Sequence, residues 1–355
     1  MLTEKLKKVF EQFDQTSNFD SYKELASGHI NDTYFIKTDE STFYVLQRIN
    51  HGVFHDVPGL IENKVAVSDH IRKKLESQGE NGNTKNVLSF VKTKAGSSYY
   101  KGDEGNYWNL MVFIKNSVTH EVVTDEEIAY EGGKLFGEFL EMTNDFDAST
   151  LCEVIPKFHD MSFRYSQFYD SLNKASAERL EKASFYIDLV NQMKEEMHIL
   201  QNLKESGAIK IRVTHNDTKI SNALFDEHNK GLCVIDTDTV MPGIIHYDFG
   251  DAIRTICNTA AEDEKNLQLV NFNVAFYKAY KKGFLEKIGT AISELESKYL
   301  IQGTKSMIFI MAIRFLTDFL NGDIYYKTSY GEHNLDRSKN QFKLLQSLNE
   351  QINQL

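Results

Sequence analysis

Four polar side chains within a short stretch of the chain have the types and the spacing that a group-transfer reaction needs. They are His215, Asp217, Lys219 and Asn222. A carboxylate such as Asp217 can orient or deprotonate a hydroxyl group, and the amide oxygen of Asn222 can bind a hard cation. The spacing His-x-Asp-x-x-x-x-Asn is that of a loop on which phosphoryl-transfer enzymes hold a base and a metal ligand. We therefore interpret this segment as a phosphoryl-transfer centre, with Asp217 and Lys219 as its catalytic residues.

A second oxygen ligand follows in a predicted β-hairpin. Two short apolar runs flank the polar turn of residues 226–231, which is typical of two antiparallel strands. Positions at equal distance from the centre of the turn, near Asn229, face each other, which predicts that Asn222 lies directly opposite Asp236. Magnesium in proteins usually binds one or two carboxylates together with substrate phosphates. Asn222 and Asp236 are therefore the predicted metal ligands.

The same residues also have structural interpretations. In one of them Asp217 caps backbone N–H groups and Asn222 closes a turn, so that the segment is a buried polar turn without chemistry. A literal Asp-Phe-Gly motif begins at Asp248, too far along the chain to face Asn222 in the hairpin. We interpret Asp248 and Asp251 as the N-cap and third-residue carboxylates of a helix over residues 252–260.

Longer stretches around these residues resemble the aminoglycoside phosphotransferase and choline kinase family and, within it, the N-acetylhexosamine 1-kinases. The resemblance covers most of the chain. It implies an α+β, two-lobed protein-kinase-like fold, with a small β-rich N-terminal lobe and a larger, mainly helical C-terminal lobe. It also implies binding of ATP and magnesium and an amino sugar as the small-molecule substrate. The segments that carry it are Thr214-His-Asn-Asp-Thr-Lys-Ile-Ser-Asn222, Val234-Ile-Asp-Thr-Asp-Thr-Val-Met-Pro242, Tyr247-Asp-Phe-Gly-Asp-Ala-Ile-Arg254 and Arg314-Phe-Leu-Thr-Asp-Phe-Leu-Asn-Gly-Asp-Ile-Tyr325.

Length and charge limit the class of protein. A chain of 355 residues exceeds the size at which one hydrophobic core usually stops growing, so two lobes are expected. We predict an N-terminal lobe of residues 1–114 that covers the nucleotide, and a C-terminal lobe of residues 115–355 with the catalytic loop and the metal and acceptor sites. The formal net charge of −11, without a Lys/Arg-rich stripe, argues against nucleic acid as a partner.

Cysteine usage and the apolar segments suggest the compartment. Cys152, Cys233 and Cys257 are few and widely spaced, which argues against a disulfide framework or a zinc site and suits a reducing cytoplasm. Residues 1–13 predict an amphipathic helix that carries acids, unlike a signal peptide. The longest apolar run, residues 307–313, is much shorter than a membrane span. We expect a cytoplasmic protein without a membrane partner, and the sequence, which does not fix an oligomeric state, is compatible with a monomer.

The turn of residues 27–33 is the predicted phosphate-covering loop of the first lobe. It contains one glycine, whereas a glycine-rich loop has three. Asn31 and Thr33 are predicted to bind ATP, because their polar side chains can replace some backbone donors. An ordinary Asx-type turn is the alternative. The resemblance to sugar 1-kinases places His29 near the sugar.

The strand that follows departs from the kinase pattern. The strand lysine that contacts phosphates in kinases is replaced by Gln47, so the usual Lys–Glu pair is absent or altered. Gln47 is still a predicted ATP-binding residue, and Lys219 is a candidate source of the missing charge, the alternative being a solvated loop lysine. Adenine is expected to bind the backbone around Met111 and Phe113, before a polar hinge at residues 115–120.

In the second lobe, residues 305–320 are apolar on nearly every side and predict a buried helix that contains Arg314. A buried guanidinium needs a partner, and Asp318, one turn further on, is the structural candidate. The resemblance instead makes Arg314 and Tyr325 sugar-binding residues. Asp238 is assigned to substrate binding, with a supporting role behind the metal site as the alternative.

The remaining alternation and periodicity predict further elements. Strands are expected at residues 34–37, 43–49, 87–91 and 107–114, and helices at residues 60–75, 125–142 and, as one or two long helices, 165–203.

We therefore predict an ATP- and magnesium-dependent kinase that phosphorylates the anomeric hydroxyl of N-acetylglucosamine or N-acetylgalactosamine. ATP and magnesium would bind between the lobes, and the sugar mainly against the larger one. A kinase for an aminoglycoside, choline or homoserine is one alternative. A non-catalytic nucleotide-binding module is another, suggested by Gln47 and the glycine-poor loop, but the presence of Asp217, Asn222 and Asp236 together speaks against it.

Overall fold

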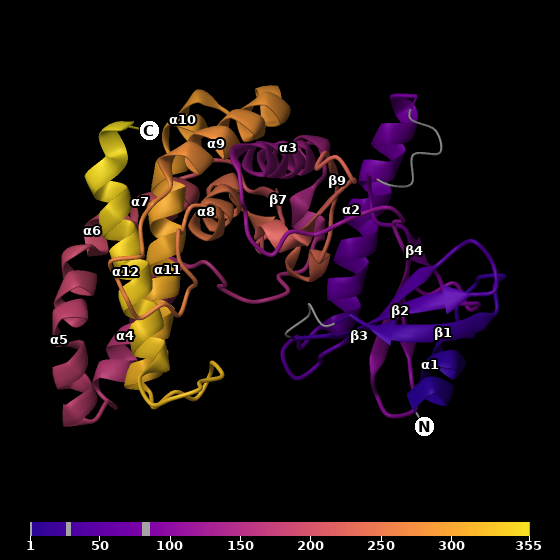
Figure 1. Ribbon diagram of the computed structural model, residues 1–355, viewed down its shortest axis with the longest axis horizontal. Coiled ribbons are helices and arrows are strands. Elements are labelled where there is room, and N and C mark those ends of the chain that lie inside the picture. The colour runs from indigo at the N-terminus through magenta and orange to yellow at the C-terminus, as the bar shows by residue number, and fades with distance from the viewer. Residues whose placement is uncertain (1, 26–29, 80–85, 355) are drawn as a thin grey trace. The chain divides into compact units, whose positions relative to one another are not determined.

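The computed structural model describes residues 2–25, 30–79 and 86–354, and the chain forms two compact units (Figure 1). Both units are discontinuous in sequence, whereas the sequence predicted a single boundary after residue 114. Unit 1 contains Met1–Thr119, Met142–Ile155 and Asn222–Pro242, and unit 2 contains His120–Glu141, Pro156–Ser221 and Gly243–Leu355. The predicted metal ligands thus belong to unit 1, and Asp217 belongs to unit 2.

Unit 1 is built on an antiparallel sheet with the strand order β1-β2-β3-β6-β4, in which β5 also pairs with β6. The four predicted strands are present, while β1 and β5 were not predicted because their sequences are short and mostly polar. The strands are β1 (Phe19–Glu24), β2 (Asp32–Thr38), β3 (Tyr44–Ile49), β4 (Phe90–Val91), β5 (Tyr100–Lys101) and β6 (Tyr107–Val112).

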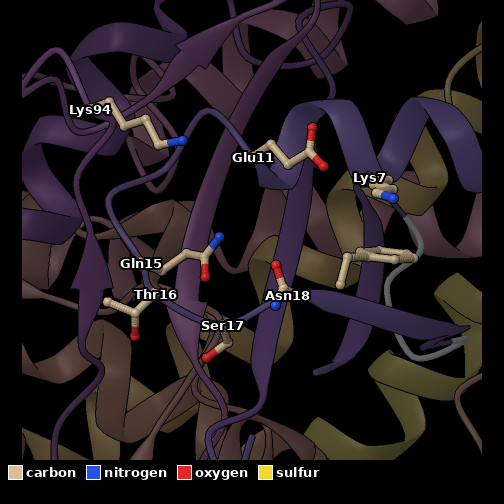
Figure 2. A pocket seen from close by; sticks show the side chains of 8 residues that line it. Lys7, Glu11, Gln15, Thr16, Ser17, Asn18 and Lys94 are labelled. Atoms are coloured by element: carbon tan, nitrogen blue, oxygen red, sulfur yellow. The ribbon is translucent and has the colours of Figure 1, made fainter. Parts of the chain in front are cut away.

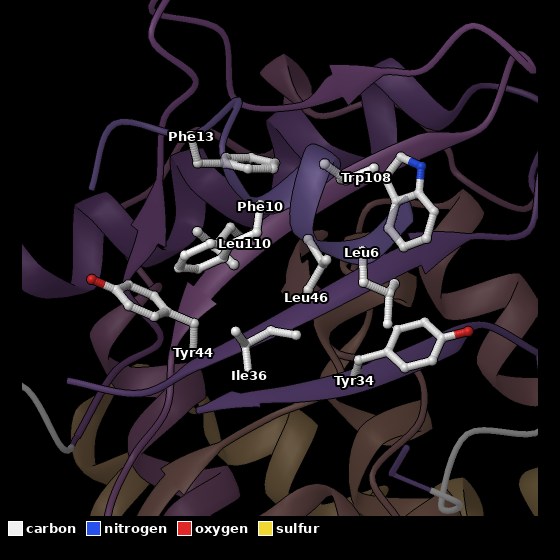
Figure 3. Packing of buried hydrophobic residues seen from close by; sticks show 10 residues of the cluster. Leu6, Phe10, Phe13, Tyr34, Ile36, Tyr44, Leu46, Trp108 and Leu110 are labelled. Carbon is white, nitrogen blue, oxygen red and sulfur yellow. The ribbon is translucent and has the colours of Figure 1, made fainter. Parts of the chain in front are cut away.

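One face of this sheet is covered by the N-terminal helix α1 (Leu2–Phe10), as Figure 3 shows. Leu6 and Phe10 of the helix pack on Ile36, Leu46 and Leu110, all of which are fully buried. Side chains alternate between the two faces of a strand. Because Leu46 faces α1, its neighbour Gln47 must face the other side of the sheet.

Helix α2 (Val57–Ser77) contributes polar groups to that other side. It begins at the N-cap Asp56, whose side chain accepts a hydrogen bond of 3.0 Å from the N–H of Gly59. Most of its buried residues are apolar, but Lys64 lies among them and is 1% exposed. The remaining elements of unit 1 are η1 (Ala148–Thr150), the hairpin β8 (Ala223–Phe225) and β9 (Gly231–Val234), and η3 (Thr237–Thr239); β10 (Met241–Gly243) leads into unit 2.

Unit 2 is mainly helical, and α11 (Leu300–Leu320) packs against α4, α8 and α12 at its centre (Figure 1). The predicted buried helix is confirmed. By length and composition α11 could span a membrane, but 78% of its most apolar window is buried inside the protein, as in a core helix. The other elements are α3 (Glu126–Met142), α4 (Met161–Leu172), α5 (Ala177–Gln192), α6 (Lys194–Met197), α7 (Ile199–Glu205), β7 (Arg212–Thr214), η2 (Ile220–Asn222), α8 (Ile245–Ile256), α9 (Val274–Ile288), η4 (Gly289–Ala291), α10 (Glu294–Lys298), α12 (His333–Gln351) and η5 (Ile352–Gln354).

Two predictions for helices of unit 2 need correction. The helical stretch over residues 165–203 is divided among four helices, and one break lies where Ser176 caps the start of α5. Helix α8 begins at Ile245, not after Asp251. Its start lacks a side-chain cap, because Ile244 occupies the N-cap position.

Candidate functional site

The predicted catalytic loop follows strand β7 in unit 2, and its first residue, His215, is fixed against helix α3. His215 is fully buried, and its ring lies edge-on to Phe136 and Phe139, at centroid distances of 5.8 and 5.9 Å. The N–H of Asp217 donates to Nδ1 of His215 at 3.3 Å. The buried ring of His215 thus fixes the backbone at Asp217.

Helix α8 holds the backbone of this loop. The two oxygens of the Asp248 carboxylate accept hydrogen bonds of 2.8 Å from the N–H groups of His215 and Asn216. The N–H of Thr218 donates to Asp251 at 3.2 Å, and its hydroxyl donates to the carbonyl of Asp248 at 2.6 Å. Backbone groups on both sides of Asp217 are therefore bonded to one helix.

The predicted capping role of Asp248 and Asp251 is consequently wrong. Both lie within α8, one helical turn apart, and both are almost completely buried. Gly250 lets α11 approach closely, because an added Cβ would lie 2.3 Å from the carbonyl oxygen of Gly303. Two acids three residues apart in an apolar helix indicate buried carboxylates, and buried carboxylates need hydrogen-bond donors. This pattern could have predicted that Asp248 and Asp251 bind another segment of the chain.

Burial changes the proton affinity of both acids. It raises the pKa of Asp248 to about 7, against the opposing effect of the two backbone N–H donors, and the nearby charges of Asp251 and Asp217 act in the same direction as burial. Burial also raises the pKa of Asp251, although Arg254, 3.0 Å away, opposes the shift. The two acids by which α8 holds the predicted catalytic loop thus both have pKa values raised by burial.

Asp217 and Lys219 lie next to each other at the end of this loop. Nζ of Lys219 is 3.4 Å from the carboxylate of Asp217, and about a third of each side chain is exposed. The two predicted catalytic residues are therefore brought together, and both can be reached by a substrate.

The predicted hairpin exists in unit 1, but its register differs by one position. Ala223 pairs with Val234, and the N–H of Ile235 donates to the carbonyl of Asn222 at 2.9 Å, so Asn222 is opposite Ile235 and not Asp236. The turn causes the shift. Asn229 has a positive φ of 59°, and the strand pairing is irregular between Leu224 and Phe225.

Asn222 and Asp236 nevertheless lie at the same end of this hairpin, just beyond the paired residues Ala223 and Val234. Asp236 has a left-handed backbone, with φ 58°, which turns the chain out of the strand into η3. Its side chain is half-buried, and Asn222 is 4% exposed. One carboxylate and one amide suit magnesium with phosphate oxygens as further ligands. Within the described ranges, no group of three or more His, Cys, Asp or Glu side chains could enclose a metal ion.

Asp238, two residues further on, is the centre of a buried polar network. It forms an ion pair with Lys64, and its other oxygen accepts hydrogen bonds from Asn31 and, at 3.3 Å, from Gln47. Nζ of Lys64 also donates to the side-chain oxygen of Gln47 at 3.0 Å, as does the amide of Asn109 at 3.3 Å. Both oxygens of Asp238 are thus occupied by residues of unit 1.

Other predicted nucleotide-binding residues lie in or next to the same sheet. Thr33 pairs with Gln47 across β2 and β3. Met111 belongs to an apolar cluster, and the N–H of Phe113, just after β6, donates to the carbonyl of Phe43 at 2.8 Å. That cluster joins the sheet to the hairpin and consists of Leu88, Met111, Ile114 and Cys233, with Val45, Phe90, Leu224, Leu232 and Ile235 packed against it. The predicted sugar contact His29 lies outside the described residues.

Arg314 of α11 is surrounded by aromatic rings. Its guanidinium carbon lies 5.5 Å from the ring centroids of Phe158 and Tyr326 and 6.0 Å from that of Tyr325. Tyr325 is 71% exposed. The two predicted sugar-binding residues, Arg314 and Tyr325, are therefore neighbours in unit 2.

Asp318, the alternative partner predicted for Arg314, binds backbone N–H groups instead. Its carboxylate accepts hydrogen bonds from the N–H groups of Ile324, Tyr325 and Tyr326, at 2.9 to 3.1 Å. Asp318 therefore fixes the backbone that carries Tyr325. In the part of the chain that the structure describes, no carboxylate lies within ion-pair distance of Arg314.

A hollow of about 210 Å³ beside α1 contains none of the predicted site residues. It is mainly polar, and side chains such as Lys7, Glu11 and Lys94 line it (Figure 2). We therefore do not assign it to the site.

Comparison with known proteins agrees with this geometry. The chain matches the model of the APH phosphotransferase enzyme family over residues 21–283. Among solved structures, a microcompartment-associated aminopropanol kinase is 13% identical, with a TM-score of 0.62 and coverage of 99% of this chain and 98% of that one. An amicoumacin kinase in complex with AMP-PNP and Ca²⁺ is 13% identical, with a TM-score of 0.60 and coverage of 97% and 93%.

A choline kinase from Cryptosporidium parvum Iowa II has the same fold, with 14% identity, a TM-score of 0.56 and coverage of 99% of this chain and 96% of that one. At these identities the structures show a shared α+β kinase-like fold. The family match covers well over half of the sequence and includes the predicted catalytic loop and the hairpin. The chain therefore belongs to the phosphotransferase enzyme family.

Proposed function

We propose that this phosphotransferase is an ATP- and magnesium-dependent kinase that phosphorylates the anomeric hydroxyl of a free N-acetylhexosamine, N-acetylglucosamine or N-acetylgalactosamine. The observation that carries the choice of acceptor is the environment of Arg314. The guanidinium lies beside the exposed ring of Tyr325 and is not paired with a carboxylate of the described residues. Its N–H groups can donate to hydroxyl or amide oxygens of an uncharged sugar.

The charges around Arg314 argue against a cationic acceptor such as choline or an aminoglycoside. Burial, and then the charge of Arg314, lower the pKa of Arg164 to about 10, which indicates that two cationic groups lie near each other. Burial and these two arginines also hold the pKa of His159 well below its usual range. A positively charged ligand would be repelled here, whereas a polyol would find donors.

The roles of the reacting groups follow from the loop and the hairpin. Asp217 orients the acceptor hydroxyl and accepts its proton, and Lys219 supplies positive charge beside it. Asn222 and Asp236 would hold magnesium, which neutralises charge on the phosphates when it is bound. Because phosphoryl transfer has a loose transition state, positioning and charge contribute more than proton abstraction. The hydrogen bonds from α8 to the loop provide this positioning.

Unit 1 carries the proposed nucleotide site. The adenine ring of ATP would pack against the apolar cluster around Met111. It would also contact the backbone near Phe113, at the end of β6. Asn31, Thr33 and Gln47 would lie on the phosphate side. Both oxygens of Asp238 already accept hydrogen bonds from residues of unit 1, so we assign it a supporting role behind Asp236. We retain His29 as a sugar contact, and we propose the cytoplasm as the location because the three cysteines are free thiols.

The experiment that tests this function compares acceptors. ATP consumption should be measured with N-acetylglucosamine and N-acetylgalactosamine, and with choline, homoserine and an aminoglycoside. Phosphorus NMR then identifies the phosphorylated position. We expect a sugar 1-phosphate from at least one N-acetylhexosamine. A preference for an amine, or phosphate on the 6-hydroxyl, would overturn the acceptor assignment.

A further inference from the structure

The buried ion pair between Lys64 and Asp238 has a consequence for nucleotide binding, which rests on the proposed kinase function. Lys64 occupies an apolar-stripe position of α2, three residues after Ile61 and three before Val67, both of which are buried. Its ammonium group is nevertheless buried in polar contacts with Asp238 and Gln47. Burial of a charge is costly unless it is paired, so this lysine requires Asp238 at this place.

Gln47 stands at the strand position where kinases carry a lysine. Its side-chain oxygen accepts from Lys64 at 3.0 Å, and its amide donates to Asp238 at 3.3 Å. The ammonium group that the strand lacks is therefore present at the same place, but it comes from α2. Its carboxylate partner comes from η3 and not from the helix. In the kinase pattern the strand carries the cation and the helix carries the anion. Here helix α2 carries the cation, Lys64, and η3 carries the anion, Asp238.

The pair is connected to the metal-binding residue through only two peptide units. Asp236 immediately precedes η3, and Asp238 is the middle residue of that turn. Asn63, the neighbour of Lys64, donates to the carbonyl of Val240 at 2.9 Å, just after η3. Two consecutive residues of α2 therefore fix the short segment that follows Asp236. Asp236 has a left-handed backbone, a conformation that is uncommon for residues with a side chain and that persists where the surrounding structure holds it.

We propose that Lys64 is a positioning residue for magnesium–nucleotide binding. It holds Asp238, and thereby the orientation of the Asp236 carboxylate. The role is specific to the metal-bound nucleotide, because it acts through Asp236. The acceptor, which we assign to residues of unit 2, is not affected directly.

A binding experiment on the full-length protein tests this proposal without catalysis. The dissociation constants of ATP with magnesium and of ATP with EDTA are measured by calorimetry for wild type and for the double variant Lys64→Gln/Asp238→Asn. The double variant removes both charges but keeps side chains that can hydrogen-bond, and neutral replacements of buried pairs are often tolerated. We expect magnesium–ATP binding to weaken by about tenfold or more, and metal-free ATP binding to change by less than about threefold.

A second variant removes only the cation. Lys64→Gln keeps Asp238 and a side chain that can hydrogen-bond, and we expect magnesium–ATP binding to weaken by about tenfold or more. Lys94→Gln, an exposed lysine of the same unit, is the matched control. Wild-type magnesium–ATP affinity in the neutral double variant would overturn the proposal. If that variant does not fold, wild-type magnesium–ATP affinity in a folded Lys64→Gln variant would overturn it. Failure of the wild type itself to bind magnesium–ATP would instead refute the proposed function.

Discussion

The carboxylate of Asp248 accepts a 2.8 Å hydrogen bond from the backbone N–H of Asn216, the residue immediately before Asp217. Asn216 has a positive φ of 64°, so this bond stabilises a backbone conformation that is unfavourable for a residue with a side chain. The other oxygen of Asp248 binds the N–H of His215 in the same way. The direction of the Asp217 side chain thus depends on α8.

Asp248 and Asp236 should therefore have separable effects. Asp236→Ala should abolish magnesium-dependent turnover, because it removes the only carboxylate among the proposed metal ligands. Asp248→Ala should lower kcat by about tenfold or more, by loosening the catalytic loop, and leave the magnesium concentration for half-maximal rate nearly unchanged. Magnesium titrations of both variants, with circular dichroism to verify folding, make the comparison. Loss of magnesium dependence in Asp248→Ala alone would contradict the assignment.

The raised pKa of Asp248 predicts a pH-dependent stability. Its pKa is about 7 in the folded protein and about 4 in the unfolded chain, so the folded state binds this proton more tightly. The resulting stabilisation is present in full below pH 4 and is lost as the pH rises to about 7. Relative to Asp248→Asn, the wild type should lose on the order of 2–4 kcal/mol of unfolding free energy across this window. Urea unfolding at several pH values measures this difference. A difference that grows with pH would show that the two N–H donors stabilise the anion instead.

Replacement of Arg314 should affect the acceptor and not the nucleotide. Arg314→Ala removes the guanidinium beside Tyr325, and we expect kcat/KM for the sugar to fall by about tenfold or more while the dissociation constant of ATP stays within about twofold. Lys305→Ala, on the same helix and paired with Glu196, is the matched control. Equal losses for Arg314→Ala and the control would indicate a general effect on α11.

The sequence was sufficient for the hairpin and the strands around Gln47 because these elements are local. They depend on residues close in sequence, and the structure contains them. The register of the hairpin was wrong by one, because a left-handed Asn229 and a bulge are not visible in hydrophobic alternation. Such irregularities depend on backbone geometry at single residues.

The contacts that support the site were not predicted, because they join distant segments. Asp248 contacts a loop more than thirty residues earlier, and Lys64 contacts Asp238 across 174 positions. Lys64 nevertheless lies among the apolar residues of the helix predicted over residues 60–75. Such residues indicate a buried partner, but the pattern does not identify it.

In the proposed reaction, Asp217 acts on the acceptor hydroxyl during phosphoryl transfer. The most direct measurement is the turnover of Asp217→Asn with N-acetylhexosamine and ATP, together with the dissociation constant of ATP for the same variant. The amide keeps the size of the side chain but removes its charge and its proton affinity. We predict that turnover falls by about 10²-fold or more, while the dissociation constant stays within about twofold of that of wild type. A variant that retains most of its turnover would contradict the account.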